Sequence, residues 1–137
     1  MWHVLEHLYD PAKYLKQFYE LLSDEGILVI AVPNHKSRDA GVFGPDWAAY
    51  DVPRHLWHFG PNTMRKMVGN AGFRVTETRH MPLDPFYVSI MSQKYANGGG
   101  GLVSGGIKGL QSFATSFGEA ELGSSVIYVC VKGGRNM

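Results

Sequence analysis

The chain has 137 residues, of which 45% are hydrophobic and 12% aromatic, and this composition is typical of a folded domain with one core. Thirteen basic residues stand against twelve acidic ones, and this balance argues against nucleic acid as the main partner. Cys130 is the only cysteine, which excludes a disulfide within the chain and favours a reducing compartment.

The sequence of residues 1–11 is typical of the interior of a folded domain rather than of the start of one. An apolar stretch passes through Glu6 and His7 into Asp10 and Pro11, as a buried strand passes into a helix in α/β proteins. The stretch lacks the basic-then-apolar order of an export signal. No apolar run in the chain approaches the roughly 18 residues of a membrane span. We therefore expect a cytoplasmic protein without a membrane span.

A helix, a strand and a loop are expected next. Asp10 can cap a helix that starts at Pro11, where a missing N–H costs nothing, and this helix should end near residues 23–26. Its apolar face comprises Tyr14, Leu15, Phe18 and Leu22. Residues 27–32 are an unbroken aliphatic run, the pattern of a parallel strand covered on both faces. Residues 34–60 lack periodicity and predict a long loop beyond this strand, where ligands bind in open α/β sheets.

The second half of the chain repeats a helix and a strand before the pattern weakens. A helix is predicted from Pro61 to a stop at Gly72, with an apolar face of Met64, Met67, Val68 and Ala71. Residues 73–80 alternate in polarity, as in a strand near a sheet edge. Residues 82–118 hold two loosely helical segments around a glycine run and predict a mobile helical flap. Residues 124–131 predict a buried closing strand.

Several short motifs follow one another in a characteristic order: His3-Val4-Leu5-Glu6-His7-Leu8, Asp10-Pro11, Val32-Pro33-Asn34, Pro53-Arg54-His55-Leu56, His58-Phe59 and Ala71-Gly72-Phe73. In order and spacing they resemble the C-terminal half of the class I S-adenosylmethionine-dependent methyltransferases. The similarity is to the small-molecule methyltransferases of ubiquinone biosynthesis and of bacterial cell-surface sugars. It covers roughly the first 80 residues.

The resemblance implies an α/β fold, the C-terminal half of a Rossmann-like sheet of seven strands. The last strand of that sheet is antiparallel and lies between the fifth and the sixth strands. In this sequence Trp2–Val4 would be the stub of the fourth strand, residues 27–32 the fifth, 73–80 the sixth and 125–131 the seventh. Residues 1–137 would then form a single partial domain, the acceptor-side half.

Two elements of the family's cofactor site have no counterpart in this sequence: the glycine-rich turn after the first strand and the acidic residue that binds the ribose. The dense glycines of residues 98–109 follow a helical segment instead of a strand. We therefore expect that the chain binds S-adenosylmethionine weakly or not at all and is inactive alone. Its expected partner is the missing N-terminal half.

The resemblance also implies roles for individual residues. Those expected near the methionine part of the cofactor are His3, Leu5 and Glu6. Candidates for the base that takes the proton of an acceptor hydroxyl are His7, His55 and His58, because imidazole titrates near neutrality. Residues expected to shape the acceptor pocket are Asn34, Trp47 and Arg54. The implied reaction is methyl transfer to a small-molecule acceptor, at oxygen.

Structural roles remain open for three of these residues. The Glu6 carboxylate could anchor nearby backbone N–H groups. Arg54 could hold a substrate carboxylate or phosphate, or it could pair with Asp51 while the aromatic rings pack the loop onto the sheet. Asn34 could donate to the acceptor or cap a turn.

Two other functions fit parts of the sequence. Strand 27–32 would expose an unpaired edge where the fourth strand belongs, which favours an interaction module that pairs with another chain or with a second copy. Residues 3–7 also spell H-x-x-E-H, the order of the inverted zincins, with Glu77 as a third ligand. Such a zinc hydrolase needs one continuous helix through His3 and His7. Because a helix start at Asp10 opposes that, we expect no metal.

Overall fold

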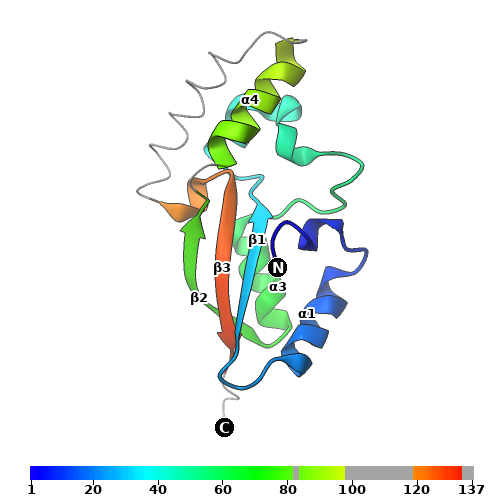
Figure 1. Cartoon of the computed structure of the whole chain (residues 1–137), viewed down its shortest axis with the longest axis vertical. Helices are drawn as coiled ribbons and strands as arrows, with labels where there is room; N and C mark the ends of the chain where they lie inside the picture. Colours follow the sequence, from blue (N-terminus) through cyan, green and yellow to red (C-terminus); the bar gives the residue numbers. More distant parts are fainter. Residues whose placement is uncertain (82–83, 98–118, 134–137) are drawn as a thin grey trace.

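A three-stranded sheet with helices packed on one face forms the body of the chain (Figure 1). The computed structural model describes residues 1–81, 84–97 and 119–133. The longer helices and the strands are α1 (Pro11–Leu21), β1 (Ile27–Pro33), α2 (Arg38–Phe43), α3 (Pro61–Asn70), β2 (Phe73–His80), α4 (Asp84–Asn97) and β3 (Ser125–Lys132). Short 3-10 turns are η1 (Leu5–His7), η2 (Gly44–Asp46), η3 (Ala48–Tyr50) and η4 (Ala120–Leu122).

The strand order is β1-β3-β2, with β3 antiparallel to both neighbours. The prediction that the last strand lies antiparallel between the two earlier strands is therefore confirmed. Val129 of β3 faces Val29 of β1 on one side and Glu77 of β2 on the other. The register of β2 shifts between Val75 and Glu77, so Thr76 forms a bulge in this edge strand.

The N-terminal residues pair with the outer edge of β1. Trp2 bridges Ala31 in parallel, with the His3 N–H donating to the Ala31 carbonyl at 2.9 Å and the Ala31 N–H to the Met1 carbonyl at 3.0 Å. This bridge lies within Trp2–Val4, where the sequence predicts the stub of the fourth strand. No other described strand pairs with this edge of β1.

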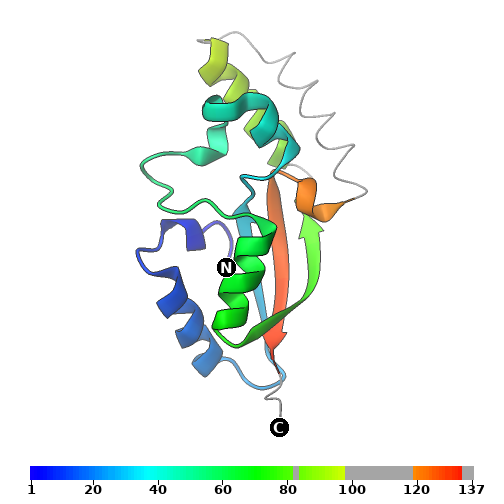
Figure 2. The same cartoon turned by 180° about the vertical axis from the view of Figure 1, so that it is seen from behind.

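Helices α1 and α3 cover one face of the sheet (Figure 2). The core between them contains Leu15, Ile30, Val32, Met64, Val68, Val126, Tyr128 and Cys130. The predicted cap of α1 is confirmed, because the Asp10 carboxylate accepts the Lys13 N–H at 3.0 Å and Pro11 is the first helical residue. Helix α3 likewise starts at Pro61 and is followed by Gly72, whose φ of +96° favours glycine.

The opposite face of the sheet is not covered by any described helix (Figure 1). The registers place five aliphatic side chains on this face: Ile27, Val29, Ile127, Val129 and Val131. The Ile27 side chain is 59% exposed. The prediction that residues 27–32 are covered on both faces is therefore wrong for the start of this strand, since α1 and α3 pack on the same side.

Residues 34–60 are more ordered than the long loop that the sequence predicts. They hold α2, η2 and η3, and the Ser37 hydroxyl caps α2 by accepting the Ala40 N–H at 3.2 Å. These turns and α4 lie beyond the carboxyl end of β1 and enclose a second apolar cluster of Ala40, Phe43, Trp47 and Val88 (Figure 1). Helix α4 is thus a packed part of the fold. The rest of the predicted flap, residues 98–118, lies outside the described residues.

Candidate functional site

A cavity of about 290 Å³ opens at the carboxyl end of β1, between the N-terminal turn, η3 and α4. Its polar lining includes His3, Asp51, Arg54, His55 and Asp84. Its apolar and aromatic lining includes Tyr87, Val88, Met91 and Tyr95 of α4. The cavity therefore has a polar end beside η1 and an aromatic wall along α4.

A buried carboxylate lies behind the polar end. The Glu6 side chain is only 1% exposed, and its Oε1 lies 3.2 Å from His3 Nδ1 and 3.9 Å from His55 Nε2. Its Oε2 has no hydrogen-bond partner among the described residues. The hydrogen bond to Glu6 raises the pKa of His3, an effect that partial burial opposes. The Glu6 carbonyl, rather than its carboxylate, accepts backbone N–H groups, from Leu56 at 2.8 Å and from Trp57 at 3.3 Å.

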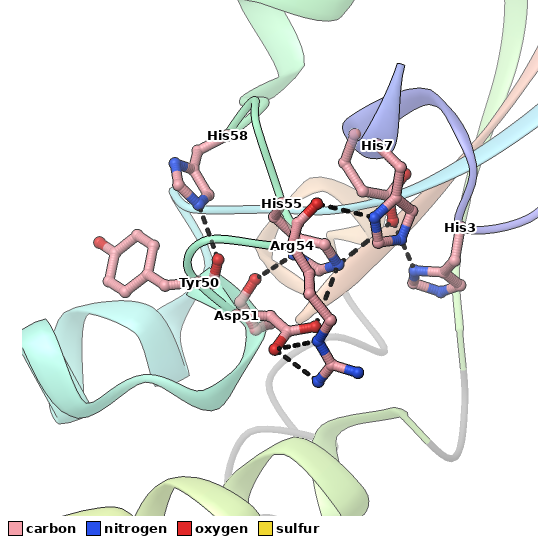
Figure 3. A network of polar contacts seen from close by, with 9 residues as sticks. His3, His7, Tyr50, Asp51, Arg54, His55 and His58 are labelled. Carbon is pink, nitrogen blue, oxygen red and sulfur yellow. Dashed lines mark hydrogen bonds and ion pairs between the residues drawn. The ribbon is translucent and has the colours of Figure 1, made fainter. Parts of the chain in front are cut away.

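Two imidazoles stand edge to face beside this carboxylate (Figure 3). The ring centroids of His7 and His55 are 4.7 Å apart. His7 Nδ1 lies 2.9 Å from the Arg54 carbonyl, and His55 Nδ1 lies 2.9 Å from the Ala49 carbonyl. Because a carbonyl can only accept, each Nδ1 carries the proton, and Nε2 of each neutral ring keeps its lone pair.

Arg54 takes the structural alternative that the sequence left open. Its side chain is 75% exposed and pairs with Asp51, with Nη2 2.6 Å from Oδ1. This pair lies at the mouth of the cavity, so the guanidinium still lines it.

Six of the nine predicted site residues lie outside the cavity lining: Leu5, Glu6, His7, Asn34, Trp47 and His58. Leu5 is fully buried in the main core. Trp47 lies in the second cluster and donates its Nε1 hydrogen to Asp39 Oδ2 at 2.8 Å. Asn34 is 1% exposed, and its Nδ2 donates to the carbonyls of Glu121 and Gly123. These side chains therefore hold the fold that frames the cavity.

His58 also lies outside the lining. Its Nε2 lies 2.9 Å from the Tyr50 carbonyl, and its ring stacks edge to face on the Tyr50 ring (Figure 3). Of the three predicted bases, only His55 lines the cavity. His7 packs against the His55 ring but is not part of the lining.

Sequence reasoning missed the contribution of α4. Asp84, Tyr87, Met91 and Tyr95 all line the cavity. The last three recur every four residues, a spacing that places them on one face of a helix and was visible in the sequence. Burial is the main cause that raises the pKa of Asp84.

The described residues fit an acceptor better than the whole cofactor. Ligand pockets usually begin at about 300 Å³, so this cavity is at the lower limit and suits a small molecule. Of the residues expected near the cofactor, Leu5 and Glu6 are buried and only His3 lines the cavity. No described strand runs into a helix through a glycine-rich turn that could hold a nucleotide.

The zinc-helix alternative is wrong. The segment His3 to His7 contains only the three-residue turn η1, and His3 has a φ of +48°. The two histidines therefore do not share a helix face, as the inverted zincins require.

None of the helices in the described part of the chain has the length and apolarity that crossing a bilayer demands.

Comparison with known proteins extends these observations. Residues 1–78 match a family described as methyltransferase domain. A ubiquinone biosynthesis O-methyltransferase of Azorhizobium caulinodans is 28% identical over 88 residues, which are 60% of this chain and 35% of that protein.

Two solved structures share the fold. One belongs to the complex of the Haloferax volcanii Trm112 methyltransferase activator with a methyltransferase. Its TM-score is 0.62 and its sequence identity 14%, and the match covers 99% of this chain and 53% of that chain. The other is the [4+2]-cyclase SpnF, with a TM-score of 0.56 and 13% identity over 96% and 47%. The chain thus spans about half of each structure. Because the family match covers residues 1–78, more than half of the chain, the protein belongs to the methyltransferase domain family, that of the class I S-adenosylmethionine-dependent methyltransferases.

Proposed function

We propose that this chain is the acceptor-binding half of a methyltransferase that moves a methyl group from S-adenosylmethionine to a hydroxyl oxygen of a small molecule. The family supports the reaction, and the name of the Azorhizobium relative, an O-methyltransferase, supports oxygen as the methylated atom. In this transfer the methyl C–S bond breaks, a C–O bond forms and the hydroxyl proton leaves. Because the sulfonium is already activated, the chain's own residues mainly position the acceptor and deal with its proton.

The two-ended cavity is the observation that carries this proposal. Tyr87 and Tyr95 offer ring surfaces against which an apolar or aromatic part of the acceptor can pack. His55 lies at the polar end, with its Nδ1 hydrogen held by the Ala49 carbonyl. Its Nε2 is left to meet the acceptor hydroxyl. We therefore assign His55, among the three predicted bases, to the acceptor oxygen.

The uncovered sheet face supports the further proposal that this half works with a second one. No described helix covers the aliphatic face that includes Ile27 and Val29. At the outer edge of β1, the described residues provide only the bridge of Trp2. Covering such a face and edge is what the N-terminal half of a wound sheet would do. We propose that the adenosine part of the cofactor binds to that second half and that the isolated chain is inactive.

A second copy could instead pair along the same edge, as in the interaction-module alternative. Sedimentation equilibrium of the chain across a hundredfold range of concentration distinguishes the two. A monomer throughout contradicts pairing between copies and leaves the second half as the proposed partner of β1.

Calorimetry with S-adenosylmethionine tests the half-site proposal. We expect no saturable binding tighter than about millimolar, equivalent to roughly −4 kcal/mol. Micromolar binding by this chain would contradict it.

Activity can be tested in a chimera. The N-terminal part of the Azorhizobium relative would be joined to this chain, and methyl transfer from labelled cofactor to a panel of phenols would be measured. His55→Gln should lower kcat at least a hundredfold, as removal of a group that handles the proton does. His35→Gln, outside the cavity lining, should leave kcat within twofold. Equal rates for the two variants would remove His55 from the reaction.

A further inference from the structure

We propose that Glu6, His7 and His55 form a binding site for a divalent transition-metal ion, with Zn²⁺ as the best match. One ligand atom from each of these residues lies within 4.8 Å of the others. Two imidazole nitrogens and one carboxylate oxygen are the donor set of open Zn²⁺ sites, whereas Mg²⁺ and Ca²⁺ prefer oxygen alone. This site differs from the rejected zinc helix, because His55 comes from a loop 48 residues after His7.

The two imidazoles are already oriented as metal ligands are. In metal sites the nitrogen that does not bind the ion usually donates its hydrogen to a carbonyl or carboxylate, which fixes the ring and the tautomer. His7 and His55 each do this through Nδ1, to the carbonyls of Arg54 and Ala49. Each therefore presents an unprotonated Nε2, the form that a metal ion binds.

One oxygen of the buried carboxylate lacks a partner, whereas the other contacts His3 Nδ1 at 3.2 Å. Glu6 is 1% exposed, and its Oε2 makes no hydrogen bond within the described part of the chain. Burying an ionised carboxylate is costly unless it is paired or binds a metal. Its Oε1 lies 3.9 Å from His55 Nε2, too far for a hydrogen bond, and Asp51 Oδ2 lies 3.8 Å from the same nitrogen. A cation among these electron-rich atoms would relieve their mutual repulsion.

Small movements would complete the coordination. Tetrahedral ligands about 2.1 Å from Zn²⁺ stand roughly 3.4 Å apart, so the widest pair, at most 4.8 Å, must close by about 1.4 Å. His7 is exposed on the three-residue turn η1, and its ring would supply that movement while it keeps its contact with the Arg54 carbonyl. His3 Nδ1, at 3.2 Å, would hold the Glu6 carboxylate in place from the outside of the coordination sphere.

The ion would lie at the polar end of the cavity, because His55 lines it. With three protein ligands, a coordination position stays open for a water or an acceptor oxygen. With the ion bound, His55 Nε2 would coordinate it instead of meeting the acceptor hydroxyl, and the ion would favour loss of the hydroxyl proton by lowering its pKa. This role in the reaction rests on the proposed function, whereas the site itself does not.

The test therefore uses metal binding alone, without cofactor or acceptor. The untagged 137-residue chain would be stripped with a chelator and titrated with Zn²⁺ and, separately, with Mg²⁺ in a calorimeter at pH 7.5. We expect one Zn²⁺ per chain and binding at least tenfold weaker for Mg²⁺. His7→Gln and His55→Gln should each weaken Zn²⁺ binding at least tenfold, since even residues behind the ligands matter by 10- to 100-fold.

His58→Gln is the matched control. This imidazole lies in the same loop and also contacts a backbone carbonyl, but it does not belong to the cluster. The affinity of His58→Gln for Zn²⁺ should stay within twofold of that of the parent chain. Circular dichroism checks the fold of each variant. If His55→Gln unfolds the chain because His55 is largely buried, the exposed His7 still provides a folded variant for the test. Absence of saturable Zn²⁺ binding, Mg²⁺ binding as tight as Zn²⁺, or equal affinities for His7→Gln and His58→Gln would each overturn the proposal.

Discussion

Replacing Asn34 by alanine tests whether this predicted pocket residue holds the fold. Its Nδ2 donates to the Glu121 carbonyl at 2.7 Å and to the Gly123 carbonyl at 3.1 Å, and its Oδ1 accepts the Lys36 N–H at 3.0 Å. Each hydrogen bond contributes about 1 kcal/mol net, so Asn34→Ala should lower the free energy of unfolding by about 3 kcal/mol. The loss arises because the end of β1 is no longer tied to the turn before β3.

Urea denaturation followed by circular dichroism measures this loss, from the midpoint and the slope of the transition. Asn62→Ala is the matched control, because Asn62 is exposed on α3 and should change the free energy of unfolding by no more than about 0.5 kcal/mol. Asn34→Asp should destabilise at least as much as Asn34→Ala, since a carboxylate oxygen would then face two carbonyl oxygens. Asn34→Ala and Asn62→Ala within 0.5 kcal/mol of each other would refute the structural role.

Three substitutions and one labelling experiment probe the core and its borders. Gly72→Ala should lower the free energy of unfolding by at least about 1 kcal/mol, because φ is +96° and a Cβ would lie 2.8 Å from the Tyr19 ring. Gly69→Ala is the control, because a Cβ there meets open space on α3, and it should raise the free energy of unfolding by up to about 1 kcal/mol in the same urea assay. Burial raises the pKa of the Cys130 thiol to about 11, so only about one thiol in a thousand is ionised at pH 8, and the native chain should resist a thiol-specific dye until urea unfolds it. Trp47→Phe should lower the free energy of unfolding by about 1.5–3 kcal/mol, because it removes the N–H donor of a hydrogen bond to the buried Asp39 carboxylate; unchanged stability would contradict that contact.

Local signals explain which parts of the fold the sequence could predict. The cap at Asp10, the helix start at Pro61 and the aliphatic run of β1 are properties of neighbouring residues, and all three occur where expected. The position of β3 between β1 and β2 has no such signal, and it was predictable only through the resemblance to a family. The order within residues 34–60 was missed because α2 has six residues, too few to show a period.

Long-range contacts explain why the candidate site was harder to predict. A polar residue at the end of a strand has the same sequence pattern whether it faces a ligand or a distant backbone. Asn34 belongs to the second kind, because the carbonyls to which it donates lie 87 and 89 residues away. The aromatic wall of α4 was missed for a different reason, because the four-residue spacing of Tyr87, Met91 and Tyr95 is also the pattern of a helix face that packs in a core.

Two of the segments that carry the family resemblance, residues 3–8 and 53–58, are parts of one hydrogen-bonded unit. The carbonyl of Glu6 accepts N–H groups from Leu56 and Trp57, and the Trp57 indole donates to the Leu8 carbonyl at 2.8 Å. His7 closes the unit by contacting the Arg54 carbonyl. A turn of three residues cannot fix a side chain alone, so the loop must hold η1 in place for Glu6, and η1 must hold the loop for His55. The segments 3–8 and 53–58 therefore build the candidate site only together, which gives a physical reason for their joint occurrence in the sequence.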